Sequence, residues 1–332
     1  MDDAQLAFLR RETPRIAPCL AADRPFWSVV IPTRNRADLL PVALASVLRQ
    51  APEPERMEVV VVDDCSATDA AREVVERIGR GRVGYRRRER NLGQVGNVNE
   101  GISGAAGHWI HVLHDDDWVE PGFYATLEQA LRIDGPIGAA MTGFRLVDAA
   151  GEVARDWPSL MSEPGVLVDA LIRFSTQIFA QPPAIVVRRD VYETLGGYHP
   201  GFELPADWEM WQRIASHYQW WYEPRVLASY RSQPVSLTGS AKSNGQNVAE
   251  ARAAIDFAQG YLPVEHAAAI GDAARRAWAV LAGRTAIRMM KKGDWRSAAV
   301  QLAECLRTEP SEAMVRGVLS LHEQLAPAPT DG

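Results

Sequence analysis

Three consecutive aspartates, Asp115, Asp116 and Asp117, are the residues of this chain best suited to chemistry. They follow an apolar run over residues 109–113 and precede Trp118. Carboxylates crowded at one strand end raise one another's pKa unless a cation lies among them. Mg²⁺ and Mn²⁺ prefer oxygen ligands that they share with substrate phosphates. The segment predicts a divalent-cation site that serves a diphosphate or, in the plainer interpretation, a solvated acidic loop that caps the next helix.

Polar residues also follow two other predicted strands. Pro32, Thr33 and Arg34 follow the apolar run 27–31, and Asp63 and Asp64 close the run 58–62. Ligands of open α/β sheets bind outside the carboxyl ends of the strands. We therefore expect these residues and the three aspartates to converge on one nucleotide site. The alternative for the pair at 63–64 is a helix cap, because aspartate is common where a turn begins.

Apolar strands alternate with amphipathic helices through the first half of the chain. Such alternation is typical of an α/β fold in which a mostly parallel sheet is flanked by helices on both faces. The predicted strands are 27–31, 58–62, 83–86 and 109–113, and the predicted helices are 39–48, a segment capped at Thr68 or Asp69 and ended by Gly79, and one that ends near Ala106.

The rest of the chain divides into a less regular part and a helical part. A helix opened by Pro121, a hairpin around 148–151 and a helix over 206–216 are predicted, and alanine-rich helical sequence follows residue 240. Residues 286–306 resemble one tetratricopeptide hairpin, which must cover its apolar face on the α/β domain or on a second copy, so a homodimer through these helices is compatible with the sequence. The predicted parts are an N-terminal extension (1–25), the α/β domain (26–240), a C-terminal helical appendage (241–325) and a disordered tail (326–332).

Composition excludes several classes of protein. A net charge of −6 argues against binding nucleic acid, which needs clustered Lys and Arg to neutralise phosphates. Three widely spaced cysteines indicate neither a disulfide framework nor a cysteine zinc site, and they favour a reducing cytoplasm. We expect no secretory signal and no transmembrane segment, because no apolar run approaches 18 residues. Peripheral attachment to a membrane remains open.

Read together, the motifs resemble the inverting glycosyltransferases of family 2, which have the GT-A fold, a Rossmann-like α/β architecture. The resemblance covers about residues 26 to 240. It implies a nucleotide-sugar donor (UDP-, GDP- or dTDP-linked), Mg²⁺ or Mn²⁺ as cofactor, and a hydroxyl acceptor on a glycan, a lipid-linked saccharide or a small molecule. The matching segments are 29–36, 60–69, 91–93 with 99–101, 113–118, and 196–198 with 206–211.

The resemblance also implies roles for single residues around the nucleotide. His114 departs from the family's usual Asp-any-Asp signature, so Asp115 either contacts the ribose or replaces the absent carboxylate. By position in the motifs, Pro32, Thr33 and Arg34 line the base and ribose, Asp63 or Asp64 bonds the base, Arg90, Asn91 and Gly93 close over the nucleotide, Asp115 and Asp116 face the donor, and Asp116 and Asp117 bind the metal.

A second motif, at the start of the predicted helix 206–216, implies the general base. The family's Glu-Asp pair is Ala206-Asp207 here, so the aspartate is kept and Asp207 takes the proton of the acceptor hydroxyl. Burial beside Trp208 and Trp211 would raise its pKa and make it a better base. The plainer interpretation is a residue that favours the helix dipole, and Glu209 is the fallback base. The nearby tryptophans form either an acceptor groove or core.

Two rival functions remain open at this point. A nucleotidyltransferase shares the nucleotide-binding sheet and the carboxylate-held metal, but it requires a glycine-rich phosphate loop after the first strand, which the segment 31–35 lacks. A catalytically degenerate member would bind a nucleotide sugar, or a partner through its helices, without turnover. The substitutions at His114 and Ala206 keep that second rival alive.

Overall fold

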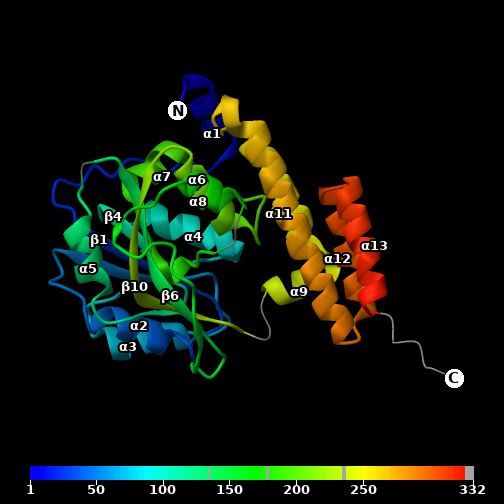
Figure 1. Ribbon diagram of the computed structural model, residues 1–332. Coiled ribbons are helices and arrows are strands. Elements are labelled where there is room, and N and C mark those ends of the chain that lie inside the picture. The colour runs from blue at the N-terminus through cyan, green and yellow to red at the C-terminus, as the bar shows by residue number, and fades with distance from the viewer. Residues whose placement is uncertain (134, 177–178, 234–236, 326–332) are drawn as a thin grey trace. The chain divides into compact units, whose positions relative to one another are not determined.

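The computed structural model describes the chain except residues 134, 177–178, 234–236 and 326–332, and also leaves undescribed the side chains of 237–240, 319 and 321–325. It divides into two compact units. The α/β unit comprises Met1–Phe174 with Ile178–Gln233, and the helical unit comprises Ser175–Gln177 with Pro234–Gly332 (Figure 1). The tail predicted to be disordered lies outside the described residues.

One mixed sheet forms the centre of the α/β unit. Its strands follow the order β3-β2-β1-β4-β9-β6-β10-β5, with β7 paired to β6 and β8 to β10. The first four are parallel neighbours, β10 is parallel to β6, and β9 and β5 run against their neighbours. The expected α/β fold with helices flanking a central sheet is confirmed, but the sheet is mixed and not mostly parallel. Among the described residues, five of its nine strand pairings are antiparallel. The strands are β1 (Trp27–Thr33), β2 (Met57–Asp63), β3 (Gly84–Arg87), β4 (Trp109–Val112), β5 (Trp118–Val119), β6 (Ile137–Val147), β7 (Val153–Asp156), β8 (Gly165–Val166), β9 (Ile185–Arg188) and β10 (Gln219–Arg231).

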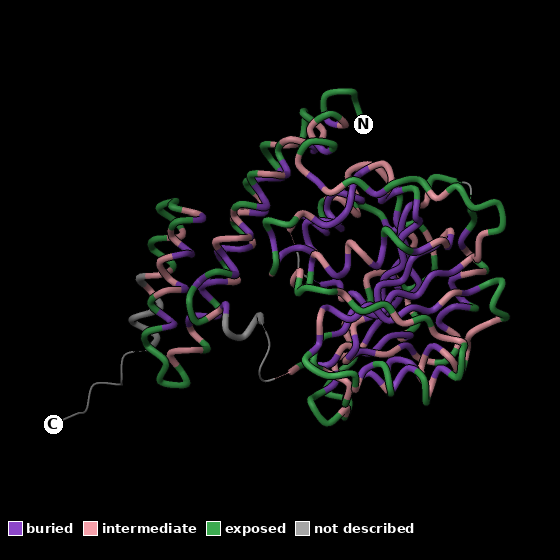
Figure 2. The backbone as a smooth tube through the Cα atoms, turned by 180° about the vertical axis from the view of Figure 1, so that it is seen from behind, coloured by how far each residue is buried: buried purple, intermediate pink, exposed green. Residues whose placement is uncertain are grey.

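Helices cover both faces of this sheet, and buried residues concentrate in its strands (Figure 2). Figure 1 shows α2 and α3 on one side of the sheet and α4 on the other. Gly101 lets α4 approach β1 closely, because a Cβ at that position would collide with the side chain of Val30. The helices of this unit are α1 (Asp3–Glu12), α2 (Leu40–Leu48), α3 (Ala70–Gly79), α4 (Gly93–Gly104), α5 (Phe123–Ala130), α6 (Ala170–Thr176), α7 (Arg189–Leu195) and α8 (Ala206–Ala215), with a short 3₁₀ helix at Pro182–Ala184. The last two residues of α6 are counted with the helical unit.

Strand β1 continues through Pro32, where the sequence predicts its end. The register pairs Pro32 with Val62 and Thr33 with Asp63, while β4 accompanies β1 only as far as Val30. A proline without an N–H is tolerated where a strand has a neighbour on one side only. The two extra residues carry Thr33 to the edge of the sheet.

The N-terminal extension is part of the α/β unit. Helix α1 begins at a capping box in which Asp2 and Gln5 each accept the other's backbone N–H. After the helix, the Thr13 hydroxyl donates to the carbonyl of Leu195 at 3.3 Å, and Gly197 N–H donates to the carbonyl of Pro14 at 2.8 Å. The segment therefore supports the turn that follows α7.

The helical unit contains the predicted helical hairpin, whose apolar face is covered inside the unit itself. Gly293 turns with φ +78°, and Asp294 caps α12 by accepting Ser297 N–H at 3.1 Å. Buried residues of α10, α11 and α12 form one cluster, with α13 packed against it, where we expected the α/β domain or a second copy to provide the cover. No described helix is both long and apolar enough to cross a bilayer. The helices are α9 (Leu237–Asn244), α10 (Gln246–Ala258), α11 (Val264–Lys291), α12 (Trp295–Thr308) and α13 (Glu312–Leu325).

Candidate active site

The carboxyl ends of β1, β2 and β4 bring together the three polar segments that the sequence predicts to converge. Thr33 and Asp63 are register partners in parallel strands, and Asp64 N–H donates to the carbonyl of Thr33 at 3.0 Å. From β1 to the loop after β4, the Thr33 hydroxyl donates to Asp115 Oδ2 at 2.6 Å. Residues about 80 positions apart in sequence therefore share one edge of the sheet, and the predicted convergence is confirmed.

Arg36 is the cation at this edge of the sheet, and the sequence predicts no role for it. Its guanidinium lies 3.3 Å from Asp115 Oδ1 and 2.7 Å from Asp116 Oδ2. Burial raises the pKa of Asp115 to about 6, although Arg36 and the Thr33 hydroxyl both act to lower it. The signal in the sequence is an arginine shortly after the end of β1, a position from which a long side chain can reach the neighbouring strand end.

Asp117 is the most deeply buried carboxylate of the three. Its Oδ1 accepts Arg231 N–H at 2.8 Å, whereas its Oδ2 has no hydrogen-bond partner among the described residues. Burial, and then the neighbouring charge of Asp116, raise its pKa well above the ordinary value. The solvated acidic loop of the plainer interpretation is therefore wrong for Asp115 and Asp117, which are 4% and 0% exposed.

A divalent cation at this site would need carboxylate oxygens that are not already bonded within the protein. In the part of the chain that the structure describes, no three His, Cys, Asp or Glu side chains are grouped to hold a metal ion. Magnesium sites that share substrate phosphates commonly use only one or two carboxylates. The unpartnered Oδ2 of Asp117 is a buried, acceptor-only atom and suits such a site, while Asp116 shares its carboxylate with Arg36.

Asp63 and Asp64 hold the loops around this edge. Asp63 accepts Ser66 N–H at 2.8 Å and the Tyr85 hydroxyl at 2.6 Å, so both of its oxygens are engaged. Asp64 Oδ1 accepts Leu92 N–H at 2.7 Å, immediately before α4. Neither caps the helix that follows β2, because the N-cap position of α3 is Asp69 and makes no side-chain cap. The helix-cap alternative for the pair is wrong.

The other residues predicted to surround the nucleotide differ in accessibility. Pro32 is buried inside β1, whereas Arg34, Arg90 and Asn91 are exposed. Neither Arg34 nor Arg90 forms an ion pair with any residue that the structure describes. Gly93 has φ +76° at the start of α4, and its N–H donates to Asn91 Oδ1 at 2.9 Å.

Asp207 lies in the first turn of α8 and shares its electrostatic surroundings with the acidic cluster. Burial raises its pKa, and the charge of His114 and a hydrogen bond from Tyr198 act to lower it. The expected rise in pKa through burial is thus confirmed. The charge of His114 also lowers the pKa of Asp115. Burial and the charges of Asp117, Asp116 and Asp207 all raise the pKa of Tyr230.

The side chain of Asn99 holds the backbone of Tyr198 in place. Its N–H donates to Asn99 Oδ1 at 2.7 Å, and its carbonyl accepts Asn99 Nδ2 at 2.8 Å. A Cβ on Gly197 would collide with Asn99, and one on Gly196, whose φ is +82°, would collide with Thr13. These glycines are required for packing within the protein. The sequence motif contained Tyr198, but only the fold shows that its hydroxyl faces Asp207.

Glu209, the fallback base, is fully buried and already paired. Arg213 Nε and Nη2 donate to its two carboxylate oxygens at 2.9 and 2.6 Å. The same guanidinium donates to the carbonyls of Leu195 and Gly197 at 2.8 and 3.0 Å. The pair therefore fixes the turn that carries Tyr198, and both oxygens of Glu209 are occupied.

The tryptophans near Asp207 are mostly core. Trp208 and Trp211 are each 4% exposed and Trp220 is 0% exposed. The rings of Trp211 and Trp220 lie 6.3 and 4.2 Å from that of Phe174. Of the two interpretations of this cluster, packing holds for these three residues, and the acceptor groove does not.

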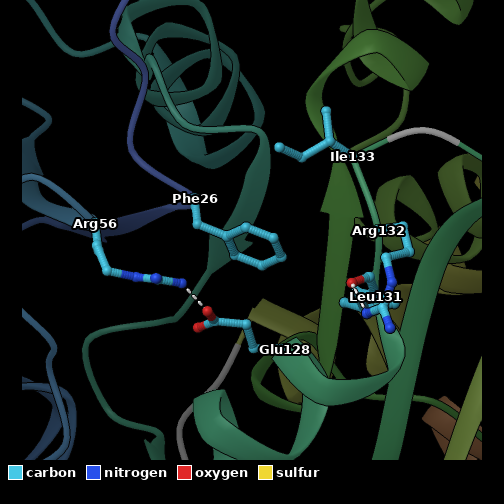
Figure 3. A pocket seen from close by; sticks show the side chains of 6 residues that line it. All are labelled: Phe26, Arg56, Glu128, Leu131, Arg132 and Ile133. Carbon is cyan, nitrogen blue, oxygen red and sulfur yellow. Dashed lines mark hydrogen bonds and ion pairs between the residues drawn. The ribbon is translucent and has the colours of Figure 1, made fainter.

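A hollow elsewhere on the α/β unit is unrelated to these groups. Figure 3 shows its lining, in which Phe26 directly precedes β1, and Arg56 and Glu128 form an ion pair. It lies by the amino end of β1, whereas Thr33 and the aspartates lie by the carboxyl ends of the strands. No residue predicted for the active site lines it.

The chain is similar in sequence to a known protein family and to several curated relatives. The family model described as Glycosyl transferase family 2 matches residues 28–196, just over half of the chain. The succinoglycan biosynthesis protein ExoO of Rhizobium meliloti is 44% identical over 97 residues, 29% of this chain and 27% of that protein. The GalNAc(5)-diNAcBac-PP-undecaprenol beta-1,3-glucosyltransferase of Campylobacter jejuni is 34% identical over 108 residues, 32% of this chain and 34% of that protein. The matches span about a third or less of these relatives.

Solved structures share the fold across nearly the whole chain. S. aureus TarS 1-349 in complex with UDP-GlcNAc has a TM-score of 0.65 at 15% identity and covers 90% of this chain and 91% of its own. The mannosyltransferase PcManGT from Pyrobaculum calidifontis, in complex with GDP-Man and Mn²⁺, has a TM-score of 0.53 at 19% identity, covering 97% and 95%. With the GT-A fold of these neighbours and a family model that matches half of its length, the chain belongs to glycosyl transferase family 2.

Proposed function

We propose that this chain is an inverting glycosyltransferase that moves a sugar from a nucleoside-diphosphate donor to an acceptor hydroxyl, with Asp207 as the general base. Family membership and the names of the relatives support the activity. One observation carries the assignment of the base. Asp207 has a pKa raised by burial and shares His114 and Tyr230 as electrostatic neighbours with the aspartates at the strand ends.

In the proposed reaction, Asp207 accepts the proton of the acceptor hydroxyl as that oxygen attacks the anomeric carbon. The new carbon–oxygen bond forms on the face opposite the diphosphate, and the bond from the anomeric carbon to the diphosphate oxygen breaks with both electrons going to the leaving group. The proton then passes from Asp207 to solvent. A raised pKa suits this role because a base with a pKa nearer the working pH accepts a proton more readily.

Tyr198 positions the base in this scheme. Its hydroxyl donates to Asp207, and its backbone is fixed by Asn99. Glu209 is left as a structural partner of Arg213, because both of its oxygens are engaged. The base role therefore falls to Asp207 and not to the fallback residue.

Asp116 and Asp117 are the proposed ligands of a divalent cation, Mg²⁺ or Mn²⁺. When bound, the cation would offset the negative charge that develops on the diphosphate. The free Oδ2 of Asp117 and the partly exposed carboxylate of Asp116 are the available oxygens. Arg36, which pairs with Asp115 and Asp116, would then share these carboxylates or turn toward the donor phosphates.

The other predicted site residues are proposed to contact the nucleotide-sugar donor. Arg34 and Arg90 are exposed cations beside the strand ends and suit contacts to the donor, together with Pro32, Thr33, Asp64, Asn91 and Gly93. Solved neighbours hold UDP-GlcNAc and GDP-Man, so UDP- and GDP-sugars are the first donors to test, and dTDP-sugars follow. The acceptor is a hydroxyl of a glycan, a lipid-linked saccharide or a small molecule, and the protein works in the cytoplasm.

A thermal-shift screen tests the donor site. The purified protein is heated with UDP-, GDP-, dTDP- and CMP-linked sugars, each with and without Mn²⁺, because a ligand that binds only the folded state raises the melting temperature. We expect one nucleotide class to stabilise the protein only when Mn²⁺ is present. Asp116→Ala should abolish the stabilisation that the donor gives in the presence of Mn²⁺.

Asp156→Ala is the matched control, since Asp156 is an exposed aspartate of β7 outside this site. It should respond to donor and Mn²⁺ as the wild type does. A donor shift that is equally large with and without Mn²⁺ would refute the cation site. Absence of a shift with every donor would favour the non-catalytic alternative.

A further inference from the structure

One segment of the helical unit has a charge opposite to that of the chain. Residues 273–293 contain six cations and no acid, although the whole chain has a net charge of −6. The segment covers about the last two thirds of α11 and the turn into α12. Such a bias within a chain of the opposite sign calls for a cause beyond solubility.

Five of the six cations lie on one side of α11 and its C-cap residue, and the sixth, Arg275, lies on another side and is paired with Asp256. Arg284, Arg288 and Lys291 follow the spacing that places side chains on one helical face, and all three are exposed. Arg276 and Lys292 flank that face and are exposed as well. The opposite side of the helix carries the buried residues Ala279, Ala282 and Ala286, which pack inside the unit. We call the five cations the basic face of α11.

Neighbouring acids do not neutralise the basic face. None of its five residues forms an ion pair within the described part of the chain, and the Arg288 guanidinium donates to the Thr285 hydroxyl at 3.0 Å. Four other arginines of the unit, Arg252, Arg275, Arg307 and Arg316, do form ion pairs, as Arg275 does with Asp256 at 2.5 Å. The helix dipole favours cations only in the last turn, so it leaves Arg276 and Arg284 unexplained.

An exposed aromatic side chain lies where the basic face ends. Trp295 is 62% exposed at the first position of α12, within four residues of Lys291 and Lys292 and next to the exposed Arg296. The other nine tryptophans of the chain are buried or half-buried. An indole that stays in water carries a cost in free energy that scales with its apolar area. Contact with an apolar layer would remove that cost.

We propose that the basic face of α11 and Trp295 dock the protein onto the surface of an anionic lipid bilayer. Each Lys or Arg near an anionic membrane surface contributes to binding, and tryptophan prefers the level of the headgroups. The row from Arg276 to Lys292 extends over about 24 Å, long enough to contact several lipids. A soluble polyanion would pair with the cations but would leave the indole without an apolar partner. The proposal does not depend on the proposed catalytic function.

Vesicle sedimentation tests this surface. The full chain is mixed with phosphatidylcholine vesicles that contain or lack phosphatidylglycerol, and bound protein is measured at low and high salt. We expect binding only to the anionic vesicles, weakened by salt. The variant Arg284→Gln/Lys291→Gln/Lys292→Gln should bind about 100-fold more weakly, at roughly five-fold for each cation.

The matched control removes three exposed, unpaired cations from the α/β unit, as Arg10→Gln/Arg15→Gln/Arg77→Gln. It should bind vesicles as the wild type does. Lipids with brominated chains should quench part of the tryptophan fluorescence of the wild type, and that part should be missing in Trp295→Phe.

Three results would overturn the proposal. They are undiminished vesicle binding by the triple variant, an equal loss in the control, and binding to heparin without binding to vesicles, which would assign the basic face to a soluble polyanion. Stabilisation by a donor sugar is measured on the same variants. If it is absent while vesicle binding holds, the proposed catalytic function fails and the membrane surface stands.

Discussion

At the scale of single residues, the candidate site depends on how Asp207 differs from the other acids near it. Glu209, two positions later, has both oxygens bound by Arg213, and Asp63 has both oxygens bound by Ser66 and Tyr85. The Asp207 carboxylate accepts from Tyr198 and has a pKa raised by burial. An acid with a raised pKa and spare acceptor capacity is suited to take up a proton.

Asp207→Asn should keep the affinity for the donor and lower kcat by about 10²- to 10⁴-fold, because the amide cannot accept the proton. Donor affinity is measured by titration calorimetry and kcat by release of the nucleoside diphosphate. Asp38→Asn, an exposed aspartate before α2, is the control and should retain full activity. Near-normal turnover of Asp207→Asn would assign the base role to another group.

Tyr198→Phe should move the acidic limb of the pH profile of kcat/KM to higher pH. The hydrogen bond from Tyr198 acts to lower the pKa of Asp207, so its loss raises that pKa further, and the base becomes protonated at a higher pH. Tyr124→Phe, which also removes a buried hydroxyl, here bonded to His111, should leave the limb in place. An equal shift of the acidic limb in both variants, or no shift in Tyr198→Phe, would contradict the positioning role of Tyr198.

At the scale of elements, α4 ties the parts of the site together. Asn97 Nδ2 donates to the carbonyl of Val62 at 2.8 Å, beside the end of β2, and Asn99 holds the backbone of Tyr198. These bonds require α4 to lie directly on β1 and β2, which the absence of a side chain at Gly101 permits. One helix thereby sets the distance between the carboxyl ends of β1 and β2 and the proposed base.

Gly101→Ala should destabilise the α/β unit by about 1–3 kcal/mol, because the added methyl group meets Val30 and overpacks the core. Gly317→Ala is the matched helical control. A Cβ at Gly317 meets nothing within 4 Å, so the change should be neutral or should stabilise by up to about 1 kcal/mol. Chemical unfolding measures both variants, and equal effects would refute the close approach of α4 to β1.

At the scale of the whole molecule, the crowded carboxylates make stability depend on pH. Burial raises the pKa of Asp115 to about 6, so the folded state holds its proton over a range in which the unfolded chain has released it. This contribution to stability is complete below the unfolded pKa and is lost as pH rises through the folded pKa. The site is therefore less stable at neutral pH until a ligand offsets its charge.

Asp115→Asn should stabilise the protein relative to wild type by about 3 kcal/mol at pH 7 and by little at pH 4, since a shift from 3.8 to about 6 corresponds to that amount. The free energy of unfolding is measured by urea titration in EDTA at several pH values. A difference between the two proteins that does not change with pH would contradict the raised pKa.

The sequence by itself determined the α/β class, the strand ends that carry the polar residues, and the helical hairpin of the C-terminal unit. These features follow from local periods of apolar residues and from short motifs, which act over one element or two. The convergence of Thr33, Asp63 and Asp115 also followed, because parallel strands end at a common edge.

Only the tertiary structure decided which side chains are engaged in contacts within the protein and which remain available to a ligand. That Arg36 pairs with Asp115 and Asp116, that Arg213 occupies Glu209, and that three tryptophans are core depend on contacts between elements. The same holds for β1 running through Pro32, because only the short β4 leaves that position without a second neighbour. Hydrogen bonding and burial are set by packing across the chain, and no local pattern encodes them.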